Sequence, residues 1–296
     1  MLGGIIPKSE LKQFTARDGT GLFYREWEGR KHKNVVIYLH GLESHMGWFM
    51  ETGNFLNRKG FHVYAVDRRG SGMSQVNRGH IDSYKTFLED IKEMVELARE
   101  EHPGKRIYLM GLCWGGKIAV TFAAYHQDLI DGLILVAPAI RAKVTISLKA
   151  KIDVLFSTLF RPRKLFGVPL EDHMFTKNPK YLDFIKKDDL KLKKVTARFF
   201  FETGKMDIHF KSIAHRIHIP VLVLLAGEDQ IVDNQKVKKW FHEISSKDKT
   251  LKIYHDCYHS LQFEKEAKTI TNYIANWIRR EDSLSAEEHV EVKTKE

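Results

Sequence analysis

Short apolar segments alternate with amphipathic segments along most of the chain. Six apolar segments have the length of strands and are rich in Val, Ile, Leu and Tyr: NVVIYLH, HVYAVD, RIYLMG, GLILVAP, VLVLLAG and LKIYH. The middle ones are almost continuously apolar, as strands buried on both faces should be. Between them, segments such as SYKTFLEDIKEMVELAREE place apolar residues three and four apart, which predicts helices. The alternation indicates a mostly parallel sheet covered by helices on both faces.

The two ends of this pattern differ from its middle. Near the N-terminus, LKQFTAR and LFYREWE flank DGTG, a turn signal, and predict an opening hairpin. The final segment, EDSLSAEEHVEVKTKE, is polar and lacks aromatic residues, which predicts a disordered tail at 281–296.

The alternation stops after Pro138 and resumes at IPVLVLLAG. From about Ile140 to Ile217 the sequence is helical in pattern, basic and aromatic, with no clear strand. VTISLKAKIDVLFSTLF and LKKVTARFFFE predict helices, and RPRKLFGVP interrupts them. We therefore predict a helical cap at 140–217, inserted into a core formed by 1–139 and 218–280.

Composition narrows the class of protein. Hydrophobic residues make up 43% of the chain and charged residues 29%, which excludes a wholly disordered chain. No apolar run approaches the ~20 residues of a membrane-spanning helix. MLGGIIPKSE lacks the basic segment and apolar core of a signal peptide. With only two cysteines, Cys113 and Cys257, no disulfide framework is expected, and the simplest expectation is a cytoplasmic protein.

The net charge of +10 is concentrated in one segment. Residues 139–219 contain 18 Lys and Arg but 8 Asp and Glu, so the rest of the chain is neutral. An anionic membrane, an anionic substrate or nucleic acid would each explain such a segment. The sequence has no helix-turn-helix, zinc-finger or RNA-binding signature, so we predict no nucleic-acid partner.

Apolar and basic residues are interleaved within the cap. The apolar set is Val154, Leu155, Phe156, Leu159 and Phe160, and the basic set is Lys149, Lys151, Arg161, Arg163 and Lys164. In one interpretation, the helix packs its apolar side on the core and its charges are solvated. In the other, the cap covers an acyl tunnel and makes peripheral contact with an anionic membrane.

The stretch GLCWGG lies between a predicted strand and a predicted helix. A nucleophile raised above a sheet needs a strained turn with small residues two positions to either side, and Gly111 and Gly115 meet that demand. The N-terminus of the following helix favours a thiolate at Cys113. The pattern therefore predicts Cys113 as a nucleophile, with a buried structural cysteine as the alternative.

A second segment, YLHGLESHMGWF, follows an earlier strand. Its histidine-glycine pair occupies the place of an oxyanion-hole loop. The predicted donors are the backbone N–H groups of Leu42 and Trp114, whose side chains need no polarity. We expect His40 to organise the turn rather than to react.

Candidates for an acid and a base follow the last two predicted strands. In LAGEDQIVD, Asp229 lies just past a strand end, with Glu228 and Asp233 as competitors; a helix N-cap is the structural alternative for Asp229. In YHDCYHSLQFE, His259 lies between the last strand and the last helix, with His255 as its rival. The order nucleophile, acid, histidine along the chain is the one this fold class requires. We predict no metal and no cofactor.

These segments together resemble an α/β-hydrolase, specifically of the monoacylglycerol lipase and lysophospholipase branch. HGLESHMGWF resembles the HG-x-x-x-H loop of that branch, and DRRGSGMS its D-x-x-G-x-G-x-S segment. GLCWGG stands where the branch has G-H-S-x-G-G, and AGEDQIVD and DKTLKIYHDCYHSL resemble its acid and histidine segments. The resemblance implies an eight-stranded sheet with an inserted cap, and a triad of Cys113, Asp229 and His259.

The departure from that branch is cysteine for serine at position 113. GLCWGG is similar to the G-x-C-x-G-G elbows of dienelactone hydrolases, polyhydroxyalkanoate synthases and bile-acid-type N-acyltransferases. We predict a hydrolase that cleaves an acyl ester or thioester of a lipid-like small molecule through an acyl-cysteine intermediate. An acyltransferase, a weakened or substituted serine lipase, and a non-catalytic binding protein are the alternatives. The sequence carries no signal for an oligomeric state.

Overall fold

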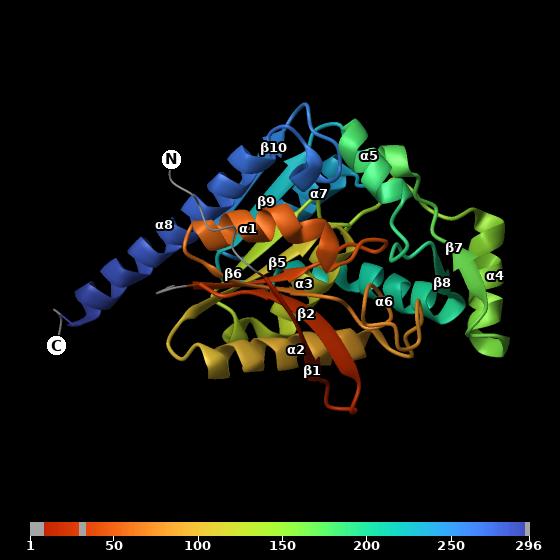
Figure 1. The fold of residues 1–296 in the computed structure, drawn as a ribbon, viewed down its shortest axis with the longest axis horizontal. Coiled ribbons are helices and arrows are strands. Elements are labelled where there is room, and N and C mark those ends of the chain that lie inside the picture. The colour runs from red at the N-terminus through yellow and green to blue at the C-terminus, as the bar shows by residue number, and fades with distance from the viewer. Residues whose placement is uncertain (1–8, 30–33, 294–296) are drawn as a thin grey trace.

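An eight-stranded sheet runs through the molecule in the order β1-β2-β4-β3-β5-β6-β9-β10 (Figure 1). The computed structural model describes residues 9–29 and 34–293, so most of the segment MLGGIIPKSE lies outside it. The strands are β1 (Glu10–Thr15), β2 (Gly21–Trp27), β3 (Asn34–Leu39), β4 (His62–Val66), β5 (Arg106–Leu112), β6 (Gly132–Val136), β9 (Val221–Ala226) and β10 (Lys249–Tyr254). β2 pairs antiparallel with β1 and β4, and the other neighbours are parallel. The predicted opening hairpin and the mostly parallel sheet of an α/β-hydrolase are confirmed.

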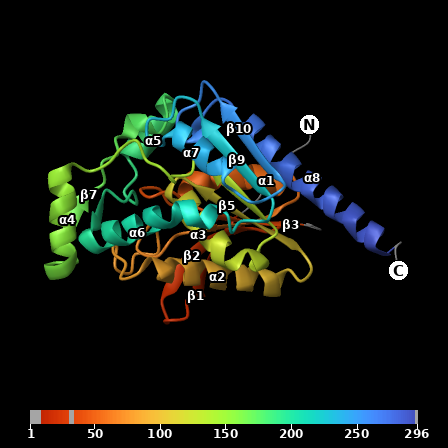
Figure 2. The same cartoon turned by 180° about the vertical axis from the view of Figure 1, so that it is seen from behind.

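Helices cover both faces of this sheet. α1 and α8 pack together on one face, and α2 and α3 on the other (Figures 1 and 2). All residues of β3, β4, β6 and β9 are buried, which explains their continuously apolar sequences. The helices around the sheet are α1 (Met50–Arg58), α2 (Tyr84–Glu101), α3 (Trp114–His126), α7 (Asn234–His242) and α8 (Ala267–Lys293).

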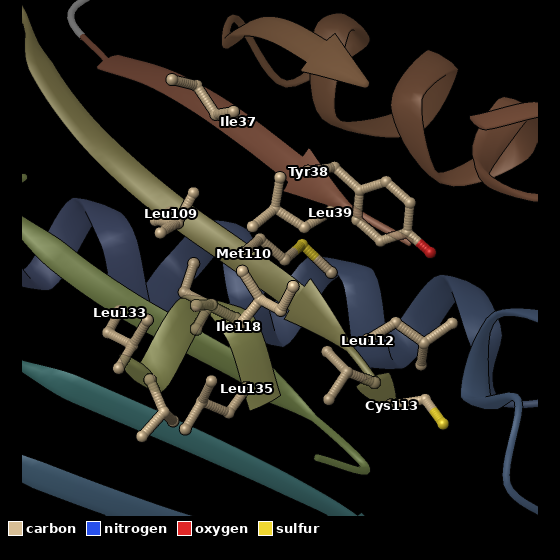
Figure 3. Packing of buried hydrophobic residues seen from close by; sticks show 14 of the residues in the cluster. Ile37, Tyr38, Leu39, Leu109, Met110, Leu112, Cys113, Ile118, Leu133 and Leu135 are labelled. Atoms are coloured by element: carbon tan, nitrogen blue, oxygen red, sulfur yellow. The ribbon is translucent and has the colours of Figure 1, made fainter. Parts of the chain in front are cut away.

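Because β3, β4, β5, β6, β9 and β10 run parallel, the loops that follow them meet at one edge of the sheet. The His40–Leu42 loop follows β3, and Arg68 follows β4. Cys113 lies just past the end of β5, beyond Leu109, Met110 and Leu112 (Figure 3). Asp229 and His259 follow β9 and β10. The edge therefore collects the chemistry-bearing loops of the whole chain.

The segment between β6 and β9 contains α4 (Leu148–Phe160), α5 (Pro179–Lys186) and α6 (Ala197–Ala214). It also contains β7 (Leu165–Gly167) and β8 (Lys194–Thr196), which pair antiparallel where the sequence predicted no strand. Strands of three residues are too short to produce an alternating pattern. The predicted helix in LKKVTARFFFE begins only at Ala197, because the Thr196 hydroxyl accepts a hydrogen bond from Phe199 N and caps α6.

α4 lies at the outer edge of the molecule (Figures 1 and 2). It packs against α6, and its buried residues are Val154, Ser157 and Thr158. Most of its large apolar side chains are exposed, by 57% to 74%: Leu148, Ile152, Leu155, Phe156, Leu159 and Phe160. The interpretation in which this helix packs its apolar side on the core is therefore wrong.

α8 continues to Lys293, so a helix occupies 281–293 where the sequence predicted a disordered tail. A polar composition argues against a buried core, but Glu, Ala and Lys are good helix formers in water. The polar stretch extends a helix whose first part packs on α1. Across residues 9–29 and 34–293, none of the helices combines the length and apolar character needed to span a bilayer.

Helix α3 approaches the strands closely at two glycines. A Cβ added at Gly115 would lie 2.2 Å from the backbone oxygen of Leu39 in β3. A Cβ added at Gly111 would lie 2.6 Å from the backbone oxygen of Gly115. Both contacts are with backbone atoms, which cannot turn aside as a side chain would. The absence of side chains at these positions therefore sets the distance between α3 and the sheet.

We expect Gly115→Ala to lower the free energy of unfolding by about 2–4 kcal/mol, because the added methyl group displaces α3 from β3. Urea unfolding measures this change. Gly204→Ala in α6 is the matched control, since a Cβ there meets no atom within 4 Å. The control should raise stability by about 0.5–1 kcal/mol through the helix preference of alanine. Equal effects at the two positions would contradict the close approach at Gly115.

Candidate active site

Cys113 occupies a left-handed turn between β5 and α3. Its φ of 53° and ψ of −118° lie outside the conformations that residues with a side chain favour. Its N–H donates to the Val136 backbone oxygen at 3.0 Å, and its own oxygen accepts from Ala139 N at 2.8 Å. Such strain costs on the order of 1–3 kcal/mol and persists only where surrounding contacts impose it. The turn raises the side chain at the carboxyl edge of the sheet.

Asp229 and His259 are joined by a buried hydrogen bond. His259 Nδ1 lies 2.8 Å from Asp229 Oδ2, and the two residues are each 1% exposed. Asp229 Oδ1 accepts from the backbone N–H groups of Ile231 and Val232 at 2.8 and 2.9 Å. Because both carboxylate oxygens are engaged, the carboxylate is fixed in one orientation. It therefore holds the imidazole with Nδ1 inward and Nε2 outward.

Electrostatics at His259 favour its cation. Burial disfavours the charged ring, but the charges of Asp229 and Cys113 outweigh burial and raise the pKa of His259 to about 10. Nε2 makes no hydrogen bond of ordinary geometry within the described residues. The interaction with Cys113 is therefore a loose one, as is common for catalytic groups without substrate.

The structure separates the proposed acid and base from their rivals. Asp233 is the N-cap of α7, where its side chain accepts from Lys236 N. Glu228 is 45% exposed, and its carboxylate lies 3.7 Å from Lys177 Nζ. His255 is exposed, whereas His259 is buried beside Asp229. Of these residues, only Asp229 and His259 are brought together.

The two predicted oxyanion donors flank Cys113. Trp114 is the first residue of α3, and Leu42 belongs to the loop after β3. Neither backbone N–H has a partner in the part of the chain that the structure describes. A Cβ added at Gly41 would lie 3.3 Å from Cys113 Cβ, so this loop contacts the cysteine. Two free N–H groups beside one side chain are the requirement for an oxyanion hole.

His40 organises the loop that contains Leu42. Its Nδ1 donates to the Gly41 oxygen at 2.8 Å, and its Nε2 accepts from Arg68 N at 3.0 Å. Burial, followed by the charge of Arg68, holds the pKa of His40 well below its usual range, so the ring is neutral. A neutral ring that donates at Nδ1 and accepts at Nε2 fits these two partners.

Two further residues at this edge were not predicted from the sequence. Lys143 Nζ donates to the backbone oxygen of Asp229, and Lys143 N donates to Ile231 at 2.8 Å. Arg68 contacts the loop that contains Leu42. Lys143 carried no signal in a segment rich in lysine. Arg68 lies in the DRRGSGMS motif, but nothing in the sequence indicates which of its two arginines turns toward Cys113.

Aromatic side chains of the cap segment close over the site. Phe199 of α6 stacks on Trp114 with ring centroids 5.2 Å apart. Phe175 lies edge-on to His259 at 6.0 Å. Cys113 itself is only 5% exposed. Aromatic side chains of this segment therefore contact the residues next to a buried sulfur.

The second cysteine differs from Cys113 in environment. Cys257 donates to Glu266 at 3.4 Å, and burial together with this hydrogen bond raises the pKa of its thiol to about 12. It is therefore protonated and poorly nucleophilic at neutral pH. Within 9–29 and 34–293, no group of three or more His, Cys, Asp or Glu side chains has a geometry suited to a metal ion.

Comparison with known proteins places the chain in a family. Residues 30–266 match the family described as Serine aminopeptidase, S33. Human monoglyceride lipase is 26% identical over 272 residues, which cover 91% of this chain and 89% of the human protein. Phospholipase YtpA of Bacillus subtilis is 24% identical over 247 residues, covering 82% of this chain and 94% of that protein.

A solved structure agrees with these sequence matches. The crystal structure of a soluble variant of monoglyceride lipase from Saccharomyces cerevisiae, in complex with a substrate analog, aligns with a TM-score of 0.83 at 21% identity. The alignment covers 95% of this chain and 97% of the yeast chain. Because the family match spans most of its length, this chain belongs to the serine aminopeptidase S33 family and has the α/β-hydrolase fold.

Proposed function

We propose that this protein hydrolyses an acyl ester or thioester of a lipid through a covalent acyl-Cys113 intermediate. The observation that carries the proposal is the Asp229–His259 pair, whose ring interacts loosely with a cysteine in a strained strand-to-helix turn. A cysteine that served only to pack the core would need neither the left-handed turn nor a histidine on its open side.

In the first half-reaction, the Cys113 thiol passes its proton to Nε2 of His259, its sulfur attacks the acyl carbonyl carbon, and the carbonyl electrons move to oxygen. The N–H groups of Leu42 and Trp114 stabilise the resulting oxyanion. When the intermediate collapses, the carbon–oxygen or carbon–sulfur bond to the leaving group breaks. The leaving group takes a proton from Nε2 of the His259 imidazolium, whose charge Asp229 stabilises. The product is an alcohol or thiol, and the acyl group remains on sulfur.

In the second half-reaction, water attacks the thioester carbonyl. His259, now neutral, accepts the proton of this water, and the same two N–H groups hold the oxyanion. Breakage of the carbon–sulfur bond releases the carboxylic acid and regenerates Cys113.

A glycerolipid is the proposed substrate class. Two relatives are named for this chemistry, a monoglyceride lipase and a phospholipase, and both match most of this chain. Phe199 and Phe175 contact Trp114 and His259, and such aromatic surroundings suit an acyl chain better than a polar polymer.

We propose further that α4 docks on an anionic membrane. Its exposed apolar residues lie three and four positions apart and so share one side of the helix. Exposed Lys149, Lys151, Arg161 and Arg163 surround that side. Apolar side chains enter the interface while basic ones attract anionic headgroups, each by up to about 1 kcal/mol. Docking through α4 would bring the cap segment to the membrane, where a lipid substrate resides.

Replacing Cys113 tests whether its sulfur is the nucleophile or a side chain that only packs in the core. We expect Cys113→Ala to lower turnover of a monoacylglycerol or a lysophospholipid by at least about 10³-fold, with loss of the acyl adduct in mass spectra. Cys257→Ala is the matched control and should retain both signals. Full activity in Cys113→Ala would refute the acyl-cysteine route. Cys113→Ser should also lose activity if the site is shaped for sulfur, whereas faster ester hydrolysis would reveal a site shaped for serine.

The raised pKa of His259 predicts a pH dependence of stability. An unfolded histidine titrates near 6.5, and this one titrates near 10 when folded. The imidazolium therefore stabilises the fold fully below pH 6.5, and this contribution is lost as pH rises from 6.5 through 10, by at most about 1.4 kcal/mol per pH unit. Urea unfolding from pH 6.5 to 9.5 should show this loss relative to His259→Gln. If the free energy of unfolding changed with pH equally in the wild type and in His259→Gln, the raised pKa of His259 would be contradicted.

Vesicle co-sedimentation tests the docking of α4. We expect binding to anionic vesicles but not to neutral ones, and weaker binding at high salt. Arg161→Glu/Arg163→Glu/Lys164→Glu should abolish binding. The control Lys239→Glu/Lys265→Glu/Lys268→Glu makes the same charge change away from α4 and should bind normally. Equal loss in the two triple variants would indicate a general charge effect, and absence of binding by the unmodified protein would refute docking.

A further inference from the structure

Arg68 is a cation beside the proposed oxyanion hole that has no carboxylate partner. No Asp or Glu oxygen lies within ion-pair distance of its guanidinium in the described residues. The neighbouring Asp67 carboxylate accepts from the backbone N–H groups of Met46 and Met73, at 2.7 Å each. A largely desolvated guanidinium without an ion pair is costly unless its donors find other partners.

The partners of Arg68 are two backbone carbonyls of one loop. Nη1 donates to the Gly41 oxygen at 3.0 Å, and Nη2 donates to the Leu42 oxygen at 2.9 Å. The Gly41 oxygen also accepts from His40 Nδ1 at 2.8 Å. Two donors therefore converge on a single carbonyl oxygen, and one of them is charged.

That carbonyl belongs to the same peptide unit as the proposed Leu42 donor. In a trans peptide, the C=O of one residue and the N–H of the next point in opposite directions. Fixing the Gly41 oxygen therefore fixes the direction of the Leu42 N–H, on the side away from Arg68. Gly41 contacts Cys113, so this peptide plane lies against the nucleophile.

A positive charge at the carbonyl oxygen also changes the amide itself. It draws electron density toward oxygen, which makes the N–H at the other end of the unit a stronger donor. The gain is largest when charge develops on the substrate oxygen in the transition state. Arg68 therefore acts on the oxyanion through the peptide and does not contact it.

The second proposed donor residue holds Arg68 in place. The guanidinium carbon lies 4.7 Å from the centroid of the Trp114 ring and 5.8 Å from that of Phe199. A planar guanidinium can stack on an aromatic face and donate to two carbonyls at once, whereas an ammonium cannot. The Trp114 side chain thus supports the cation that aligns Leu42, and the Trp114 N–H supplies the other donor.

We propose that Arg68 is a positioning residue that orients and polarises the Gly41–Leu42 peptide, so that the Leu42 N–H serves as an oxyanion donor. The proposal rests on the proposed acyl-cysteine chemistry. It predicts that Arg68 affects steps that form an oxyanion and leaves other reactions of Cys113 unchanged.

Two reactions of the Cys113 sulfur show whether Arg68 acts only on steps that form an oxyanion. Acylation by an ester passes through an oxyanion, whereas alkylation by iodoacetamide displaces iodide at a saturated carbon and forms none. The full chain is used as wild type, Arg68→Met and Arg68→Lys. Arg99→Met is the matched control, because Arg99 also donates to a backbone carbonyl, that of Leu129, and lies in the last turn of α2.

We expect Arg68→Met to lower the single-turnover rate of acylation by about 10- to 100-fold, less than complete loss of a donor. KM should stay within about threefold, and the rate of alkylation within about twofold. Arg68→Lys should also slow acylation without changing alkylation, but by a smaller factor, since lysine keeps the charge and loses the forked geometry. Arg99→Met should change neither rate.

A parallel fall of acylation and alkylation would overturn the proposal, because it would assign Arg68 to the sulfur or to the integrity of the site. Unchanged acylation in both variants would overturn it as well. If Arg68→Met fails to fold, Arg68→Lys alone decides between these outcomes. Failure of the underlying function is recognised separately, by full ester turnover in Cys113→Ala.

Discussion

The left-handed turn at Cys113 is the constraint on which the remaining arrangement depends. A residue with a side chain at φ 53° is held there only because β5 enters and α3 leaves at a separation too small for any side chain at Gly111 or Gly115. The same close packing brings the loop after β3 against Cys113 and frees the Trp114 N–H at the start of α3. The strained turn of Cys113 and the positions of the proposed oxyanion donors therefore depend on the same close packing of β5 and α3.

Asp229 and His259, the proposed acid and base, are fixed by hydrogen bonds rather than by helix packing. Both oxygens of Asp229 are used, one by the turn at Ile231 and Val232 and the other by His259. The Ala142–Val232 bridge and Lys143 tie this turn to the start of the cap segment. The position of Asp229 is consequently connected to the segment after β6 through a few contacts, although the residues concerned are far apart in sequence.

The sequence was sufficient for the order of strands along the chain, because buried parallel strands are continuously apolar and the loops that follow them meet at one edge. The sequence did not predict contacts that depend on the conformation of a loop. Arg68 and Arg69 are adjacent and chemically identical, yet Arg68 turns to the carbonyls beside Cys113 while Arg69 pairs with Asp18 and Asp90. The paired strands β7 and β8, each three residues long, have too few positions to show a period, and a polar helix such as the end of α8 has the composition of a disordered tail.

The placement of α4 and α8 has a practical consequence. They lie at opposite ends of the longest axis of the molecule in both views (Figures 1 and 2). A protein resting on a bilayer through α4 would direct the far part of α8 into the aqueous phase. A fluorophore, an affinity label or a solid support attached near Lys293 would therefore leave the lipid-facing end unobstructed, and single-molecule observation at a supported bilayer could use that attachment without blocking either surface.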